Sequence, residues 1–180
     1  MVRKAEGTRT FILKSAALVI QRDGLNALTL EKVAQEARVS KGGLLYHFKS
    51  KKALITALFS TMLDTFEWTI EQAWKQEDPT PGSWLRAYLK ASIAIHQEEV
   101  SLHSAFIAAL GNFPELLEIL NEHSQRWWER ACQDGIPIPQ AKMVMMAADG
   151  FWLSQIFKLT TIDLKTDQAT LDALFALTKP

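Results

Sequence analysis

The stretch from residue 29 to residue 52, TLEKVAQEARVSKGGLLYHFKSKK, constrains the fold more than any other part of the chain. Thr29 and Ser40 each stand where a helix can begin, because their hydroxyls can accept a hydrogen bond from the first helical turn. Small and branched apolar residues recur on one helical face between them, at Leu30, Val33, Ala34 and Ala37. The small alanines allow a second helix to cross closely. The pattern predicts two short helices around a turn at Arg38 and Val39, the helix-turn-helix that lays one helix in the major groove of DNA.

The second of these helices, expected over residues 41–48, is the candidate recognition helix. Its adjacent glycines, Gly42 and Gly43, each cost about 1 kcal/mol relative to alanine inside a helix, so local stability does not explain them. Close approach of the backbone to another surface would explain them, and the floor of the DNA groove is such a surface. We therefore expect this helix to meet base edges.

The formal net charge of the chain is zero, but the charges are divided unevenly along it. Residues 1–52 hold 11 Lys or Arg against 4 Asp or Glu, a balance of +7, and residues 53–180 hold the remaining 9 against 16, a balance of −7. Only the amino-terminal part suits a polyanion. The single cysteine, Cys132, excludes an intramolecular disulfide and fits a reducing cytoplasm. The sequence shows neither a signal peptide nor an apolar run long enough for a membrane span.

The spacing of apolar residues predicts an all-α chain, with 48% hydrophobic residues and few alternating runs. The first helix is expected over about residues 8–22, with one face formed by Phe11, Ile12, Ser15, Leu18 and Val19. Ser50 is expected to cap a long helix that follows the recognition helix. The later helices are expected over about residues 51–76, 83–97, 102–110, 114–133, 140–159 and 167–177, and the clearest loop over 77–82.

The motif resembles the amino-terminal domain of the tetracycline-repressor (TetR) family of bacterial transcription regulators. The resemblance is carried by Thr29-Leu30, Val33-Ala34, Ala37, Val39 to Gly42, Leu45 to Phe48 and Lys51 to Leu54, with further matches at Ile12, Ala16-Ala17 and Gly24. It covers about residues 8–58. One departure is Arg38, which stands where such motifs commonly have glycine, so a left-handed backbone there would cost about 1 kcal/mol or more. A phosphate contact and a solvated turn side chain both stay open for Arg38.

The resemblance implies a homodimer formed through the last two helices as a four-helix bundle, and therefore a palindromic operator. It divides the chain into a DNA-binding domain over residues 1–50 and a ligand-binding and dimerisation domain over residues 51–180. Contacts at or near base edges are predicted for Lys41, Gly42 and Tyr46, and phosphate contacts for Thr29, His47 and Lys51. Ser40 and Gly43 complete the predicted DNA-binding set, Lys49 and Lys52 add attraction, and Arg3 with Lys4 forms either a basic arm or a disordered tail.

The carboxy-terminal region is rich in aromatic and thioether side chains, which can surround an apolar small-molecule pocket or simply fill a core or a dimer interface. The candidate effector-binding residues are Trp68, Phe106, Trp127, Met146, Asp149 and Trp152. Asp149 lies in the segment MMAADGFW, where a carboxylate is costly to bury unless it is paired or used. It would counter a cationic ligand beside Trp152, or else it is paired with an Arg or Lys or exposed at a helix end. The Ala-Ala-Asp-Gly-Phe pattern also resembles a segment of some TetR-type regulators of multidrug efflux.

Other chemistries find little support in the sequence. His96, Glu99 and His103 would share a face only if one helix ran unbroken through Ser101, so we expect no metal site and no cofactor. His123 is expected at the surface. The nucleophile, nucleotide and zinc-hydrolase motifs of enzymes are missing. We therefore expect a ligand-responsive repressor, released from its operator by a hydrophobic or cationic effector, with an activator or a nucleoid-type DNA binder as the alternative and an enzyme as a remote one.

Overall fold

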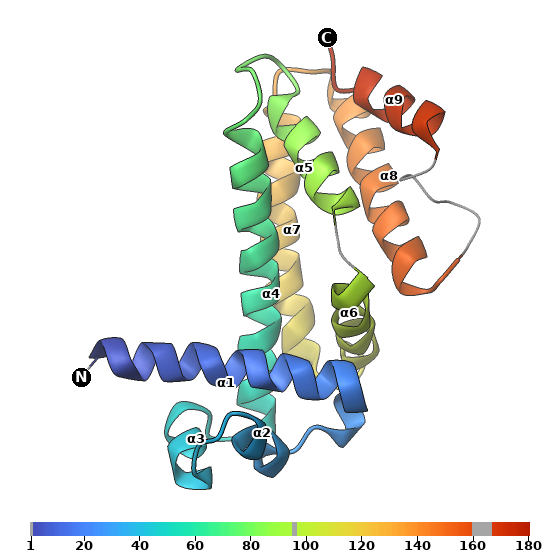
Figure 1. Cartoon of the computed structure of the whole chain (residues 1–180). Coiled ribbons are helices and arrows are strands. Elements are labelled where there is room, and N and C mark those ends of the chain that lie inside the picture. The colour runs from blue at the N-terminus through green and yellow to red at the C-terminus, as the bar shows by residue number, and fades with distance from the viewer. Residues whose placement is uncertain (1, 95–96, 160–166) are drawn as a thin grey trace. The chain divides into compact units, whose positions relative to one another are not determined.

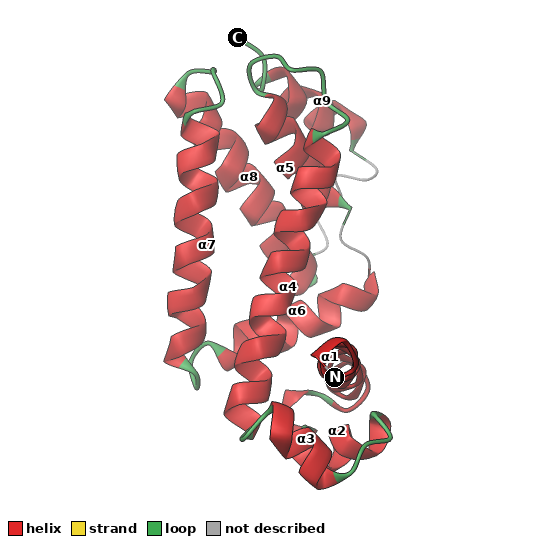
Figure 2. Ribbon diagram, turned by 90° about the vertical axis from the view of Figure 1, so that its left-hand side faces the viewer, coloured by secondary structure: helices red, strands yellow, loops and turns green. Residues whose placement is uncertain are grey.

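The computed structural model describes residues 2–94, 97–159 and 167–180, and these residues form helices with no strand among them (Figures 1 and 2). The predicted all-α class is therefore confirmed for the part of the chain that the structure describes. None of the helices there has the length and apolarity needed to cross a bilayer. The chain divides into two compact units. Unit 1 comprises residues 1–62 and 101–119, and unit 2 comprises residues 63–100 and 120–180.

Unit 1 begins with α1 (Val2–Asp23), followed by the 3-10 helix η1 (Leu25–Ala27), α2 (Leu30–Glu36) and α3 (Lys41–His47). The first part of α4 (Lys51–Trp74), most of α6 (Gln97–Ala109) and the start of α7 (Pro114–Cys132) complete the unit. Helix α1 packs against α2 and η1, and α2 packs against α3. The core contains fully buried Ile12, Val19, Leu28, Val33, Leu44, Leu54 and Ile55.

The predicted apolar face of α1 is only partly correct. Ile12, Ser15 and Val19 are buried, but Phe11 and Leu18 expose about half of their side chains, 51% and 52%. Leu13, Ala16 and Ile20, which lie outside the predicted face, are buried in the core as well. The helix also begins at Val2 rather than near residue 8, so the backbone of Arg3 and Lys4 is helical, and their side chains lie outside the described residues.

Unit 2 contains the second part of α4, α5 (Ser83–Ile93), the larger part of α7, α8 (Ile138–Ile156) and α9 (Gln168–Ala176). Helix α5 packs along α8, and eight of its residues are buried (Figure 1). The carboxylate of Asp134 accepts hydrogen bonds from the backbone N–H groups of Trp84 and Leu85, at 3.2 and 2.9 Å. Because these are donors of the first turn of α5, Asp134 caps that helix from a distant part of the chain.

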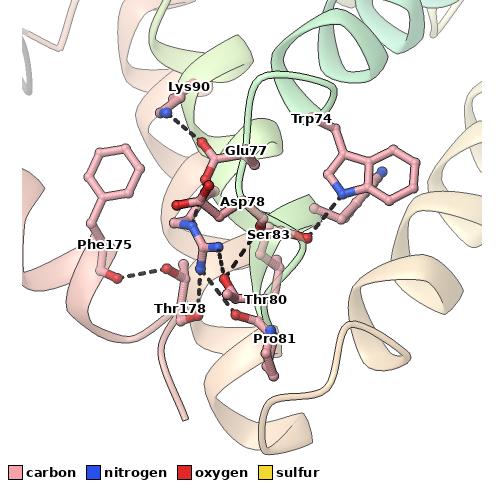
Figure 3. A network of polar contacts seen from close by, with 12 residues as sticks. Trp74, Glu77, Asp78, Thr80, Pro81, Ser83, Lys90, Phe175 and Thr178 are labelled. Carbon is pink, nitrogen blue, oxygen red and sulfur yellow. Dashed lines mark hydrogen bonds and ion pairs between the residues drawn. The ribbon is translucent and has the colours of Figure 1, made fainter.

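A polar network ties the loop before α5 to the carboxy terminus (Figure 3). The guanidinium of Arg86 donates to Glu77, to the hydroxyl of Thr80 and to the backbone oxygens of Pro81 and Thr178, at 2.7 to 3.2 Å. Lys90 also bonds Glu77. Burial opposes ionisation of Glu77, but the bonds from Lys90 and Arg86 outweigh it and hold its pKa below the ordinary value. Glu77 therefore stays charged and the network stays joined at neutral pH.

Candidate DNA-binding motif and effector region

The helix-turn-helix is built by the local signals that the sequence carries. The hydroxyl of Thr29 accepts from the backbone N–H of Lys32 at 3.2 Å and begins α2, and the hydroxyl of Ser40 accepts from Gly43 N–H at 3.0 Å and begins α3. Arg38, between the two helices, has φ +49°. The left-handed backbone expected at this position is therefore present, with an exposed arginine in place of the usual glycine.

Helix α3 presents a face to solvent that carries the predicted base-contacting residues. The side chain of Tyr46 is 79% exposed, and its ring packs edge-on against His47 with centroids 5.1 Å apart. Lys41 and Gly42 are exposed as well. A methyl group added at Gly42 would meet no described atom within 4 Å, so no contact within the described part of the chain requires glycine there. An external surface that comes close to the helix is the remaining physical reason for it.

Gly43 has a different role from Gly42. A methyl group at Gly43 would lie 3.2 Å from the hydroxyl oxygen of Ser40, which is engaged in capping the same helix. The small residue therefore protects the cap. Thr29 and Ser40 likewise already have a capping role, so their predicted contacts with DNA would come in addition to it.

The lysine and arginine side chains around the motif differ in the hydrogen bonds and ion pairs that they form within the protein. Lys51 is half-buried and donates to the backbone oxygen of Leu25 at 3.4 Å, and Lys52 pairs with Glu115 at 3.1 Å. Within the described residues, Arg38 and Lys49 form no ion pair. Both are exposed. These two cations are thus the ones most readily available to a phosphate group.

Unit 2 holds a cluster of aromatic rings around Tyr88. Its centroid lies 5.6 Å from that of Phe66, 5.5 Å from Trp84 and 6.2 Å from Trp127. The hydroxyl of Tyr88 donates to Oδ1 of Asp149 at 2.7 Å. Burial raises the pKa of Asp149, and the bond from Tyr88 opposes that rise; burial and the nearby carboxylate together raise the pKa of Tyr88. Asp149 is thus a partly buried carboxylate held by a neutral donor rather than by a cation.

A cavity of about 180 Å³ lies next to this cluster. Its lining consists of Glu67, Ile70, Glu71, Trp84, Arg126, Trp127 and Arg130. Trp127 is 7% exposed, and its indole N–H finds no hydrogen-bond partner among the described residues. A buried donor without an acceptor is costly, so a ligand that offers an acceptor would gain from meeting it.

The six predicted effector-binding residues are not all gathered in one place. Trp127 and Asp149 both belong to the surroundings of Tyr88. Trp68 and Met146 expose 63% and 66% of their side chains, and Trp152 is half-buried. Phe106 lies in unit 1, fully buried against Phe59 with centroids 5.1 Å apart. Sequence reasoning missed Tyr88, whose only signal was a polar-tipped aromatic residue within an apolar helix.

His123 was wrongly expected at the surface, since it is 6% exposed. Its Nδ1 lies 3.2 Å from Glu67 and 2.9 Å from a guanidinium nitrogen of Arg126, and its Nε2 lies 3.8 Å from Asp64. Ligand atoms of His123, Asp64 and Glu67 come within 4.8 Å of one another. Because the Arg126 cation already occupies this side of the ring, the geometry favours an ion-pair network over a metal. Of the other three residues considered for a metal, His96 and the side chain of Glu99 lie outside the described residues.

The described residues are helical and combine a capped helix-turn-helix with an aromatic, cavity-containing unit, which is an architecture found among bacterial regulatory proteins. Two family descriptions match it: "Bacterial regulatory proteins, tetR family" over residues 12–58, and "Tetracyclin repressor-like, C-terminal domain" over residues 82–179. The second match covers more than half of the chain. The chain belongs to the TetR family.

Individual relatives are distant. The HTH-type transcriptional regulator RutR of Escherichia coli K12 is 29% identical over 96 residues, which are 53% of this chain and 44% of RutR, so the chain spans less than half of that relative. A transcriptional regulator from Rhodococcus shares the fold with a TM-score of 0.76 at 19% identity, over 94% of this chain and 95% of that one. The multidrug binding protein EbrR, solved with malachite green, gives a TM-score of 0.71 at 20% identity over 96% and 98%.

Proposed function

We propose that the protein is a ligand-responsive transcriptional repressor that binds a palindromic DNA operator as a homodimer in the cytoplasm. The observation that carries the proposal is the face of α3, where an exposed Tyr46 and an unobstructed Gly42 follow a properly capped turn. In this proposal Lys41, Gly42 and Tyr46 read base edges, and Arg38 and Lys49 join the predicted phosphate contacts. No catalytic step is part of the proposal.

A stripe of exposed apolar residues on α8 supports the homodimer. It consists of Met143, Met146 and Leu153 of α8 and of Phe157, the residue that follows the helix; they are 38% to 66% exposed, with the open Gly150 at the centre. Their spacing of three and four residues repeats as in a helix seam, and glycine at the centre permits close crossing of a second helix. None of the residues of α9 is buried either. An exposed apolar stripe along α8 and an unburied α9 are what a four-helix interface between two copies would cover.

The proposed effector site surrounds Tyr88, whose hydroxyl bonds Asp149 and whose ring lies near the rings of Trp84 and Trp127. Among the residues that the structure describes, the Asp149 carboxylate is bonded by a neutral hydroxyl, which leaves lone pairs free for a ligand cation. Aromatic faces attract the same charge. EbrR, a multidrug binding protein, is described with malachite green. We therefore propose a hydrophobic cationic effector for this chain. Met146 and Phe106 remain predicted contacts.

Helix α4 offers a route from the effector to the DNA. It is continuous from Lys51 to Trp74, contributes residues 51–62 to unit 1 and the rest to unit 2, and therefore carries both Lys51 and the aromatic Phe66. A tilt of this helix on ligand binding would change the distance between the two recognition helices of the dimer. Because each good base contact discriminates by about 1–3 kcal/mol, losing register on one half-site would abolish specific binding.

The test begins with selection of duplexes from a random pool by the purified protein at moderate ionic strength. We expect the selected sequences to share a palindrome with half-sites about one helical turn apart. Lipophilic cations and neutral hydrophobes of similar size are then compared for the rise in melting temperature they cause and for release of the selected duplex. If the protein prefers no duplex over the others, it is not a regulator of this kind. If an effector binds tightly but leaves the affinity for the operator unchanged, the proposed coupling between effector binding and DNA binding is wrong.

A further inference from the structure

Lys41, at the beginning of the recognition helix, is not a free cation. Its Nζ lies 2.6 Å from Oε1 of Glu31, a residue of the first turn of α2, and both side chains are 62% exposed. The hydrogen bond from Lys41 lowers the pKa of Glu31, so the Glu31 carboxylate is ionised at neutral pH. A carboxylate near the amino terminus of α2 is further favoured by the helix dipole. An acidic group thus stands beside a side chain that would meet DNA.

The other acidic side chains described near the motif are used differently. Glu36 pairs with Arg22 at 2.9 Å, and Asp23 pairs with Arg22 and with Lys32 at 3.0 and 3.3 Å. The Arg22–Glu36 and Asp23–Lys32 pairs join α1 to α2, and none of the three pairs involves α3. Of the acidic groups around the motif, Glu31 alone among the described ones bonds a residue of the recognition helix.

The pair changes which partner Lys41 prefers. A phosphate group is an anion, so it is repelled by the Glu31 carboxylate while it competes for the same ammonium. The O6 and N7 atoms of guanine are neutral acceptors and meet much less of this repulsion. Since an ammonium has three donors, it can bond Glu31 and a base edge together. Charge compensation therefore weakens phosphate binding by Lys41 more than it weakens base binding.

We propose that Glu31 is a specificity-determining residue: by pairing with Lys41 it converts a general phosphate contact into one selective for a neutral base acceptor such as the guanine edge. This inference rests on the proposed function, because it presupposes that α3 enters the major groove. It adds a role for a residue of α2 that would otherwise be an unfavourable charge next to DNA. Lys41 supplies the contact, and Glu31 acts through it as a positioning residue.

The experiment compares Glu31→Gln with Glu36→Gln, which removes the same charge from the same helix. Binding to the duplex selected by the wild-type protein and to random duplex is measured over a range of salt concentrations. For Glu31→Gln we expect random duplex to bind about 3–10-fold more tightly, the selected duplex to gain less than about 2-fold, and the salt slope to steepen by about 0.9, the value of one added phosphate contact. For Glu36→Gln we expect both duplexes to shift by the same factor.

Two further measurements separate the mechanism from a general charge effect. Repeating the selection with Glu31→Gln should weaken the guanine preference at one position of each half-site. In a Lys41→Met background, Glu31→Gln should no longer change the ratio of specific to random binding, because the side chain through which it acts is gone. Unchanged melting temperatures of the two Gln variants show that folding is intact.

The inference is overturned if Glu31→Gln and Glu36→Gln change both affinities equally, or if Glu31→Gln loses the selected duplex without tightening on random DNA. Either result leaves the proposed function standing, since the wild-type protein has then already selected an operator. If the wild-type protein selects no duplex, the proposed function fails and the role of Glu31 fails with it.

Discussion

Replacing Gly82 with alanine tests whether the contact of Thr178 with the loop before α5 stabilises the fold. Gly82 has φ +78°, and a methyl group there would lie 1.7 Å from the backbone oxygen of Thr178. Alanine in this left-handed conformation costs about 1–2 kcal/mol. Relieving the clash requires Thr178, which is fully buried, to move away from Arg86, whose guanidinium donates to the same oxygen at 3.2 Å.

Losing that charge-assisted bond adds about 1.5–3 kcal/mol, so the total destabilisation is about 2.5–5 kcal/mol. For a chain of this size each kcal/mol lowers the melting temperature by about 2–4 °C, which predicts a fall of about 5–20 °C. Thermal unfolding followed by circular dichroism measures it.

The matched control is Gly111→Ala. A methyl group at Gly111 meets nothing within 4 Å, and its φ lies outside the left-handed range, so we expect a change within about 0.5 kcal/mol. Deleting residues 178–180 removes the clash but not the strain, and in that background Gly82→Ala should cost only about 1–2 kcal/mol. A full-length Gly82→Ala protein that melts within 2 °C of the wild type would show that this contact does not stabilise the fold.

Three further predictions concern other contacts. Lys51→Ala should weaken binding to selected and random duplexes alike and reduce the salt slope by about 0.9, as one phosphate contact is lost; an unchanged slope removes Lys51 from the interface. Tyr88→Phe should destabilise the fold by about 1–3 kcal/mol in denaturant titrations, because the buried Asp149 carboxylate loses its donor; equal stability contradicts a structural role for the bond. Affinity for a cationic effector should fall as pH drops through the pKa of Asp149, which burial raises above 3.8, and an affinity independent of pH in that range argues against Asp149 as the counter-charge.

The network around Glu77 gives an acid-stability prediction with a definite sign. Its pKa is lowered in the folded protein, so its stabilising contribution is present above the ordinary value of 4.5 and is lost as pH falls through the lower folded value. Glu77→Gln should therefore destabilise the protein at neutral pH and flatten the fall in stability below pH 4.5. Parallel acid-unfolding curves for the two proteins would contradict this.

Local signals explain why so much of the helix-turn-helix was predictable. A cap needs only a hydroxyl and the N–H group three residues later, so Thr29, Ser40 and Ser50 each begin a helix as expected. The spacing of apolar residues is also a local signal, and most helix boundaries lie within two or three residues of those predicted from it. The left-handed turn at Arg38 also follows from the motif alone. The sequence by itself therefore determined the helical class, the motif and its charge.

Only the tertiary structure decided which side chains meet across helices. It joined Tyr88 to Asp149 at a separation of 61 residues, buried His123 against α4, and exposed Phe11 and Leu18 on α1. These outcomes depend on the direction in which each helix is rotated against its neighbours, and a rotation of one residue exchanges a core position for a surface one. Hydrophobic spacing only partly determines that rotation, because the hydrophobic effect is non-directional and neighbouring faces of one helix satisfy it nearly equally.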